Sequence, residues 1–240
     1  MTRGIGGSDT ATELARLQDM SAGAEPIGNA EFAARLQRAQ QLMQAAGLDA
    51  LYLNAGTNLL YFTGTRWSPS ERMVGALIPA QGEPRYIAPA FELGTLQGFL
   101  RVAGEVHCWE EHESPYRLCA QLLEDMHVTT LGVDESAPFF IVDGLQQAAP
   151  QCRVQSATPI TAGCRMQKSA AELALMQRAK DMTLEVHRSV ARILRPGITT
   201  AEVTAFIHEA HKRVGAPAGS YFCIVLFGPD SAFPHGVAQP

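Results

Sequence analysis

Apolar positions between residues 30 and 156 switch repeatedly between helical and strand-like spacing. Phe32, Leu36, Ala39 and Met43 recur at three- and four-residue steps, and Gly47 stands where a helix commonly ends. Short β-prone segments and helical segments then alternate along the chain. The expected strands are 49–53, 73–79, 84–89, 105–109, 130–134 and 152–155, and the expected helices are 58–62, 91–100, 116–126 and 141–149. This alternation predicts an α/β domain with a largely parallel or mixed sheet.

The pattern changes after Cys164, where two long helices are predicted. Ser169 with Glu172, and Thr199 with Glu202, have the spacing of capping boxes, which start helices. The first helix carries an apolar stripe at three- and four-residue steps and is expected to end before Pro196-Gly197. The stripe comprises Leu173, Met176, Ala179, Thr183, Val186, Val190 and Ile193. The continuous apolar run at 220–228 then predicts a buried strand.

These patterns predict three regions with limits at residues 29 and 161. Residues 1–29 are rich in small and polar side chains, so we expect a flexible N-terminal arm with one short helix near residues 12–20. Residues 30–161 form the predicted α/β domain. Residues 162–240 hold only two helices and one or two strands, which predicts an incomplete second domain.

Composition narrows the classes of function. The net charge is −5, and no cluster of basic residues offers a footprint for a nucleic acid. Five widely spaced cysteines without a CxxC motif suit reduced thiols in a cytoplasmic protein. Neither a transmembrane run nor a secretory signal is visible, so we expect a cytoplasmic location without membrane contact.

Histidines are the main candidates for chemistry. His208 and His211 are three residues apart, whereas zinc proteases use the HExxH spacing, so a solvated helix face is the preferred interpretation. His235 differs because it lies in Phe-Pro-His-Gly after a predicted strand, where an imidazole can transfer protons near neutral pH. A loop histidine without a function is the alternative. Nucleotide-binding glycine loops and the GxSxG motif are absent.

For three other residues, a ligand-binding role competes with a purely structural one. Arg66 and Trp67 follow the YFTG turn and form either the rim of a ligand site or ordinary packing. Asn58 is interpreted as a local turn or capping residue in preference to a ligand contact.

Five segments, taken together, resemble the pita-bread metallopeptidases with a creatinase-type N-terminal domain, which are the Xaa-Pro aminopeptidases and Xaa-Pro dipeptidases (prolidases). They are RLQRAQQLMQAAGLDALYL, NLLYFTG, CRMQKSAAELALMQRA, PGITTAEV and SYFCIVLFGPDSAFPHG, at residues 35–53, 58–64, 164–179, 196–203 and 220–236. The resemblance implies an α/β fold: a creatinase-type domain with a mixed sheet, then the truncated beginning of an α+β pita-bread domain.

The resemblance also implies hydrolysis of the bond between a first residue and a following proline. In that family two divalent metal ions, usually manganese, activate a water molecule between carboxylate ligands and one histidine. The turn histidine lies beside the metals and contacts the substrate or the tetrahedral intermediate, and by position it is His235. Phe222 is expected to line the substrate pocket.

The family's metal ligands lie further along its sequence than the position matching Pro240. We therefore expect none of them in this chain, no metal bound to it, and no activity for the chain alone. Creatinase-like hydrolases share the architecture and stay an alternative. A second alternative is a non-catalytic assembly or binding module, because this domain commonly packs against a partner subunit as a homodimer or larger homo-oligomer. Arg66 and Trp67 are then the candidate contact residues.

Overall fold

The computed structural model describes residues 5–238 and divides into two compact units. One unit is Ile27–Lys168, called the sheet unit here. The other, the helical unit, holds the described residues up to Pro26 together with those from Ser169 onward. The chain therefore begins in the helical unit, forms the whole sheet unit, and returns.

The sheet unit is built on a six-stranded mixed sheet with the order β4-β3-β2-β1-β5-β6. Strand β2 is antiparallel to both of its neighbours, β1 and β3, while β4 is parallel to β3, β5 is parallel to β1, and β6 is parallel to β5. The predicted mixed sheet is thus confirmed. The strands are β1 (Ala50–Asn54), β2 (Gly75–Pro79), β3 (Arg85–Pro89), β4 (Glu105–Trp109), β5 (Thr130–Val133) and β6 (Arg153–Ser156).

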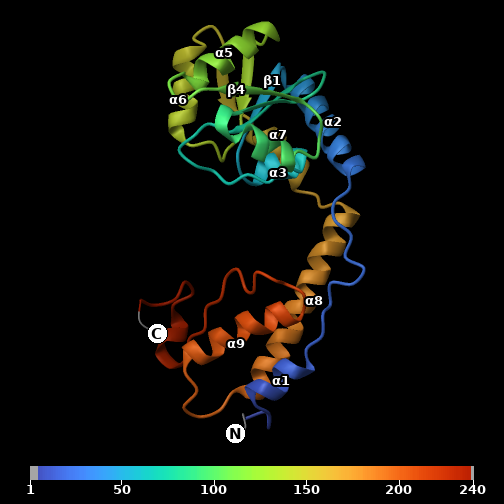
Figure 1. Cartoon of the computed structure of the whole chain (residues 1–240), viewed down its shortest axis with the longest axis vertical. Helices are drawn as coiled ribbons and strands as arrows, with labels where there is room; N and C mark the ends of the chain where they lie inside the picture. Colours follow the sequence, from blue (N-terminus) through green and yellow to red (C-terminus); the bar gives the residue numbers. More distant parts are fainter. Residues whose placement is uncertain (1–4, 239–240) are drawn as a thin grey trace. The chain divides into compact units, whose positions relative to one another are not determined.

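Helices cover both faces of this sheet (Figure 1). Successive side chains of a strand point to opposite faces, so apolar side chains on both faces need helices to pack against. Leu51 and Leu53 of β1 pack in the core that includes residues of α2 and α3, whereas Tyr52 packs in the core that includes residues of α5 and α6. The helices of this unit are α2 (Asn29–Ala46), α3 (Thr57–Thr63), the 3-10 helix η1 (Ala90–Glu92), α4 (Leu93–Phe99), α5 (Pro115–Asp125), α6 (Phe139–Ala148) and α7 (Thr158–Arg165).

Two glycines of the sheet unit show why the chain uses that residue. Gly47 ends α2 at φ +66°, and its N–H reaches the carbonyls of Met43 and Gln44, which confirms the predicted helix end. At Gly75 a Cβ atom would lie 2.3 Å from the carbonyl oxygen of Leu53 on the neighbouring strand. The close approach of β2 to β1 there therefore leaves no room for a side chain.

The helical unit contains α1 (Thr10–Arg16), α8 (Ala170–Ile193), α9 (Thr200–Arg213) and the 3-10 helix η2 (Gly228–Ala232). Both predicted capping boxes are present at the starts of α8 and α9. Only part of the predicted α8 stripe is buried within this unit. Val186 and Ile193 are 1% and 3% exposed, whereas Leu173 and Met176 near the start of the helix are 54% and 49% exposed.

Two predictions differ from the structure of the helical unit. The predicted strand at 220–228 is wrong, since no strand is formed in the described part of that segment and most of its large apolar side chains are exposed. A strand needs a neighbour to take up its backbone hydrogen bonds, and the sheet formed by the described residues does not include this segment. Within the arm expected at 1–29, residues around α1 pack into the core of α8 and α9 instead of standing apart.

The predicted domain limits at residues 29 and 161 stay a prediction, because compact packing units need not coincide with inherited domains. Among the described residues, no helix is long and apolar enough to cross a lipid bilayer.

Candidate functional site

An open groove in the helical unit brings together α9 and the segment that carries His235. Its volume is about 1020 Å³. Thr204 and His208 line it from one face of α9, and Cys223 and His235 line it from the C-terminal segment. Ordinary ligand pockets span roughly 300–1,000 Å³, so the groove has room for a small peptide.

The position of His235 follows from a tight turn. The amide of Gly236 donates to the carbonyl of Phe233 over 3.0 Å, which leaves Pro234 and His235 at the two central positions. Gly236 has φ +87°, a conformation that favours glycine. The sequence interpretation of proline and glycine as turn residues is therefore confirmed, and the turn exposes the imidazole.

The imidazole of His235 has no hydrogen bond or ion pair to another described side chain. A free ring nitrogen can donate a hydrogen bond to an oxyanion or exchange a proton with a bound substrate. Near it, burial raises the pKa of the Cys223 thiol, although a hydrogen bond with Thr204 opposes this. The thiol is therefore protonated at neutral pH and is a poor candidate nucleophile.

The other predicted substrate-binding residues lie apart from this groove or in the other unit. Phe222 is 73% exposed and is not among the groove residues. In the sheet unit, Trp67 is half-buried against the core, and its ring meets that of Phe99 edge to face at 6.3 Å between centroids. Arg66 beside it is exposed. These contacts give Trp67 a packing role, while a ligand role for the pair stays a prediction.

The metal-binding potential of the described residues is low. No three His, Cys, Asp or Glu side chains among residues 5–238 come together as a metal site. In the rejected His208–His211 pair, Nδ1 of His211 lies 2.8 Å from the carbonyl oxygen of Ile207 in its own helix. The residues present do not fit a divalent ion, so no chemical step is assigned to a metal here.

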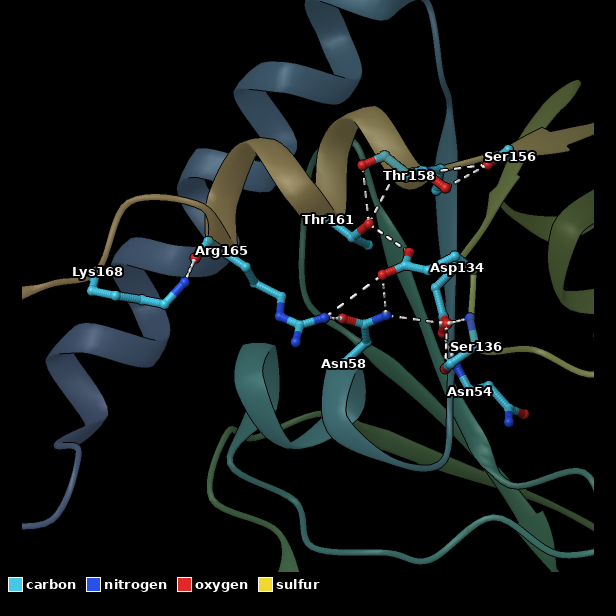
Figure 2. Close-up of polar contacts among 11 residues, drawn as sticks. Asn54, Asn58, Asp134, Ser136, Ser156, Thr158, Thr161, Arg165 and Lys168 are labelled. Carbon is cyan, nitrogen blue, oxygen red and sulfur yellow. Dashed lines mark hydrogen bonds and ion pairs between the residues drawn. The ribbon is translucent and has the colours of Figure 1, made fainter. Parts of the chain in front are cut away.

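A polar cluster in the sheet unit was not found from the sequence (Figure 2). It lies where parallel strands β1 and β5 end, and its centre is the buried carboxylate of Asp134, which is 2% exposed. This carboxylate accepts hydrogen bonds from the backbone amide of Asn54 at 2.5 Å, from Nδ2 of Asn58 at 3.2 Å and from the amide of Ser136 at 2.7 Å. Asp134 thus joins β1, α3 and the segment after β5.

Helix α7 closes the same cluster from the other side. Nη1 of Arg165 donates to Oδ1 of Asn58 at 2.7 Å and lies 3.6 Å from Glu135, while the Thr161 hydroxyl donates to Glu135 at 2.7 Å. Burial opposes ionisation of Glu135. Hydrogen bonds from Thr161 and Asn58, with the charge of Arg165, outweigh that effect and lower its pKa.

Asn58 therefore does more than cap a local turn, which corrects the sequence interpretation. It is 1% exposed and connects residues 76 and 107 positions further along the chain. Every oxygen of this cluster that faces inward has a donor within the protein, which is the arrangement of a structural network. No sequence signal could reveal it, because its partners are distant in the chain.

Two family models match the chain in succession. Residues 35–167 match the Creatinase/Prolidase N-terminal domain, and residues 174–240 match Metallopeptidase family M24. The first match alone covers more than half of the sequence. The chain therefore belongs to the creatinase/prolidase family, and the expected fold, a creatinase-type α/β domain followed by the beginning of an M24 domain, is confirmed.

Individual relatives agree with this family. Probable dipeptidase PepE of Mycobacterium tuberculosis is 33% identical over 206 residues, which are 85% of this chain and 54% of PepE. Putative dipeptidase YkvY of Bacillus subtilis is 30% identical over 211 residues, which are 84% of this chain and 56% of YkvY. The crystal structure of dipeptidase PepE from Mycobacterium ulcerans superposes with a TM-score of 0.69 at 32% identity, covering 78% of this chain and 51% of that one. The chain spans about half the length of these relatives.

Proposed function

We propose that this chain is the N-terminal portion of a metallopeptidase that hydrolyses Xaa-Pro bonds in dipeptides or short peptides. The observation that carries the proposal is the order of the two family matches, with the His235 turn placed inside the M24 match. Relatives described as dipeptidases support a peptide substrate, and the sequence motifs support proline in the second position.

In this proposal His235 acts on the carbonyl oxygen of the scissile bond. Its exposed imidazole donates a hydrogen bond to the oxygen, which becomes negative as water adds to the carbonyl carbon. Removing one donor of this kind from an enzyme typically lowers kcat about 10²- to 10³-fold. By resemblance, Phe222 is also proposed to line the substrate pocket, although its ring is exposed and is not among the residues that line the groove.

We propose bound metal ions only for the whole enzyme and not for the 240-residue chain. Two divalent ions, manganese by resemblance, would activate the attacking water there. Since the described residues hold no group of metal ligands, we expect those ions to be bound elsewhere and the 240-residue chain alone to be inactive.

Assembly and location are separate proposals. We propose a cytoplasmic homodimer or larger homo-oligomer in which Arg66 and Trp67 of the sheet unit contact a partner subunit. In the whole enzyme, Trp67→Ala should weaken the dimer or raise KM, as measured by analytical ultracentrifugation and steady-state kinetics. If the oligomer and the kinetics are both unchanged, this role for Trp67 is excluded.

The test of the function compares two proteins on matched substrates with added Mn²⁺. One is the 240-residue chain, and the other is the product of the complete reading frame that contains it. We expect the second protein to hydrolyse Leu-Pro and to leave Leu-Ala intact, and the first to hydrolyse neither. Release of leucine from Leu-Pro by the 240-residue chain would contradict the inactivity. Hydrolysis of creatine in place of Leu-Pro by the longer protein would favour creatinase-like chemistry.

A further inference from the structure

The N-terminal residues form an integral part of the helical unit. Leu14, Leu17 and Met20 pack in the same apolar core as residues of α8 and α9. Figure 1 shows α1 lying beside α8 within this unit. Leu17 is only 8% exposed, so this contact is a packed one. The core comprises Leu17, Met182, Val186, Ile193, Phe206, Ala210 and Val214, with Leu14, Met20, Val190, Ile198 and Ile207 at its edge.

An ion pair between a buried carboxylate and a partly exposed arginine joins α1 to α8. The Glu13 side chain is fully buried, and its Oε2 lies 2.7 Å from Nε of Arg192. Its Oε1 lies 2.8 Å from Nη1 of Arg16. Arg192 also donates to the hydroxyl of Ser189, a buried residue of α8, at 3.3 Å. Burying a carboxylate is costly unless it is paired, so the contact with Arg192 offsets the cost that burial of Glu13 adds to docking.

Backbone hydrogen bonds attach the same segment to the ends of both helices. The amide of Ser8 donates to the carbonyl of Arg192 at 3.3 Å, and the amide of Met20 donates to the carbonyl of Val214 at 2.9 Å. Arg192 is in the last turn of α8, and Val214 is the residue that follows α9. The last carbonyls of a helix have no partner within it, so the N-terminal segment supplies donors that the helices lack.

The N-terminal segment also packs closely against the backbone of α8. A Cβ atom at Gly6 would lie 2.5 Å from Cα of Arg192, so only glycine allows the two backbones to approach there. Residues 1–34 lie outside both family matches, which begin at residues 35 and 174. The segment is therefore an addition to the matched regions and not a part of either.

From these contacts we propose that residues 7–20 are an intramolecular clasp that closes the α8–α9 helix pair, with Glu13–Arg192 as its latch. Because the sheet unit lies between the clasp and α8 in the sequence, a docked clasp connects that unit to the helical unit through two segments of chain. Opening the latch leaves a single connection. The clasp thus determines whether one or two segments of the chain hold the sheet unit to the helical unit.

Hydrogen exchange of the 240-residue chain tests the latch. In Arg192→Met, amide exchange in α1 should become about 100-fold faster or more, because the buried Glu13 carboxylate loses its ion-pair partner on α8. The remaining partner, Arg16, lies in the same helix as Glu13 and cannot hold α1 against α8. Exchange in β1 (Ala50–Asn54), in the other unit, should not change. The matched control is Arg188→Met, which removes an arginine of α8 that is 65% exposed and paired with Glu185. Unchanged exchange in α1 of Arg192→Met would overturn the role of the latch.

A second experiment keeps the proposal testable if Arg192→Met unfolds the helical unit. The exposed residues 21–26 connect the clasp to the sheet unit, and a protease site inserted after Gly23 allows that connection to be cut. After cutting, the released N-terminal peptide should co-elute with the rest of the otherwise unchanged protein in gel filtration. Dissociation of the peptide at micromolar concentration would show that residues 7–20 do not act as a clasp.

Discussion

Asp134 shows how much of the sheet unit depends on one carboxylate. Its oxygens accept from the amides of Asn54 and Ser136 and from the side chain of Asn58, and Asn54 and Asn58 are buried residues. Through Asn58 the same network reaches Arg165 at the end of α7. The carboxylate therefore holds the ends of β1, α3 and α7 in one arrangement.

Replacement of this carboxylate should be costly. Asp134→Ala leaves the buried amide of Asn54 without its acceptor and removes one of the acceptors of Asn58, and we expect a loss of about 3 kcal/mol in the free energy of unfolding. Chemical denaturation followed by tryptophan fluorescence measures this loss. Asp125→Ala is the matched control, because that aspartate is exposed and its change should stay within about 0.5 kcal/mol. Equal stabilities of the two variants would mean that the cluster contributes nothing.

Single residues were predictable only where their partners are close in sequence. Pro234 and Gly236 indicated the turn around His235 because turn chemistry is local. Asn58 could not be interpreted correctly, since its partners Asp134 and Arg165 are brought to it only by the sheet and by α7. Arg192 was part of no prediction for the same reason, as its partner Glu13 lies 179 residues earlier.

At the scale of elements, the capping boxes were the most informative sequence signals. In α9 the Thr199 hydroxyl accepts from the amide of Glu202 at 3.2 Å, and Glu202 accepts from the amide of Thr199 at 2.8 Å. The contact is complete within four residues, so no tertiary structure is needed to predict it.

The capping box of α9 predicts that the stabilisation from Glu202 depends on pH. The amide of Thr199, with further hydrogen bonds from Arg195 and the Thr199 hydroxyl, lowers the pKa of Glu202 to about 2, from an ordinary value of 4.5. Because the folded pKa is the lower one, the stabilisation is complete above pH 4.5 and is lost as pH falls toward 2. An NMR titration of the Glu202 carboxyl should show this, and Thr199→Ala should raise the pKa. The same pKa in both proteins would contradict the capping role.

The wrong strand and the missed helix have physical explanations at this scale. Residues 220–228 have the composition of a strand, but a strand forms only beside another, and the structure gives this segment no ladder partner. Helix α7 is missing from the predicted helices because it is short, has few apolar residues, and packs against α2 through a tertiary contact. Local propensity does not determine either outcome.

At the scale of the whole molecule, the change in apolar spacing near Cys164 predicted a boundary between two regions, and the two compact units of the structure change over between Lys168 and Ser169. The domain limits themselves stay a prediction. What the spacing could not show is the return of the N-terminus to the second region. Residues 10–16 are too short to fold as a helix alone, and their stability comes from the core of α8 and α9.

We expect the two units to unfold separately, because each is a compact unit with its own apolar core. Both tryptophans, Trp67 and Trp109, are in the sheet unit, so tryptophan fluorescence follows that unit alone. Far-UV circular dichroism follows both units. We expect the two signals to give different midpoint temperatures in thermal unfolding of the 240-residue chain. Arg192→Met should lower only the midpoint of the helical unit, which circular dichroism detects and tryptophan fluorescence does not. Coincident transitions in both proteins would show that the molecule unfolds as one cooperative unit.

The central claim is that His235 acts in the hydrolysis of Xaa-Pro bonds, and its most direct test is the kcat for Leu-Pro. The measurement compares His235→Ala with the unchanged enzyme, both produced from the complete reading frame, and uses His187→Ala, an exposed histidine of α8, as the control. We predict that His235→Ala lowers kcat about 10²- to 10³-fold with little change in KM, while His187→Ala has no effect. A kcat for His235→Ala within about threefold of the unchanged enzyme would contradict the account.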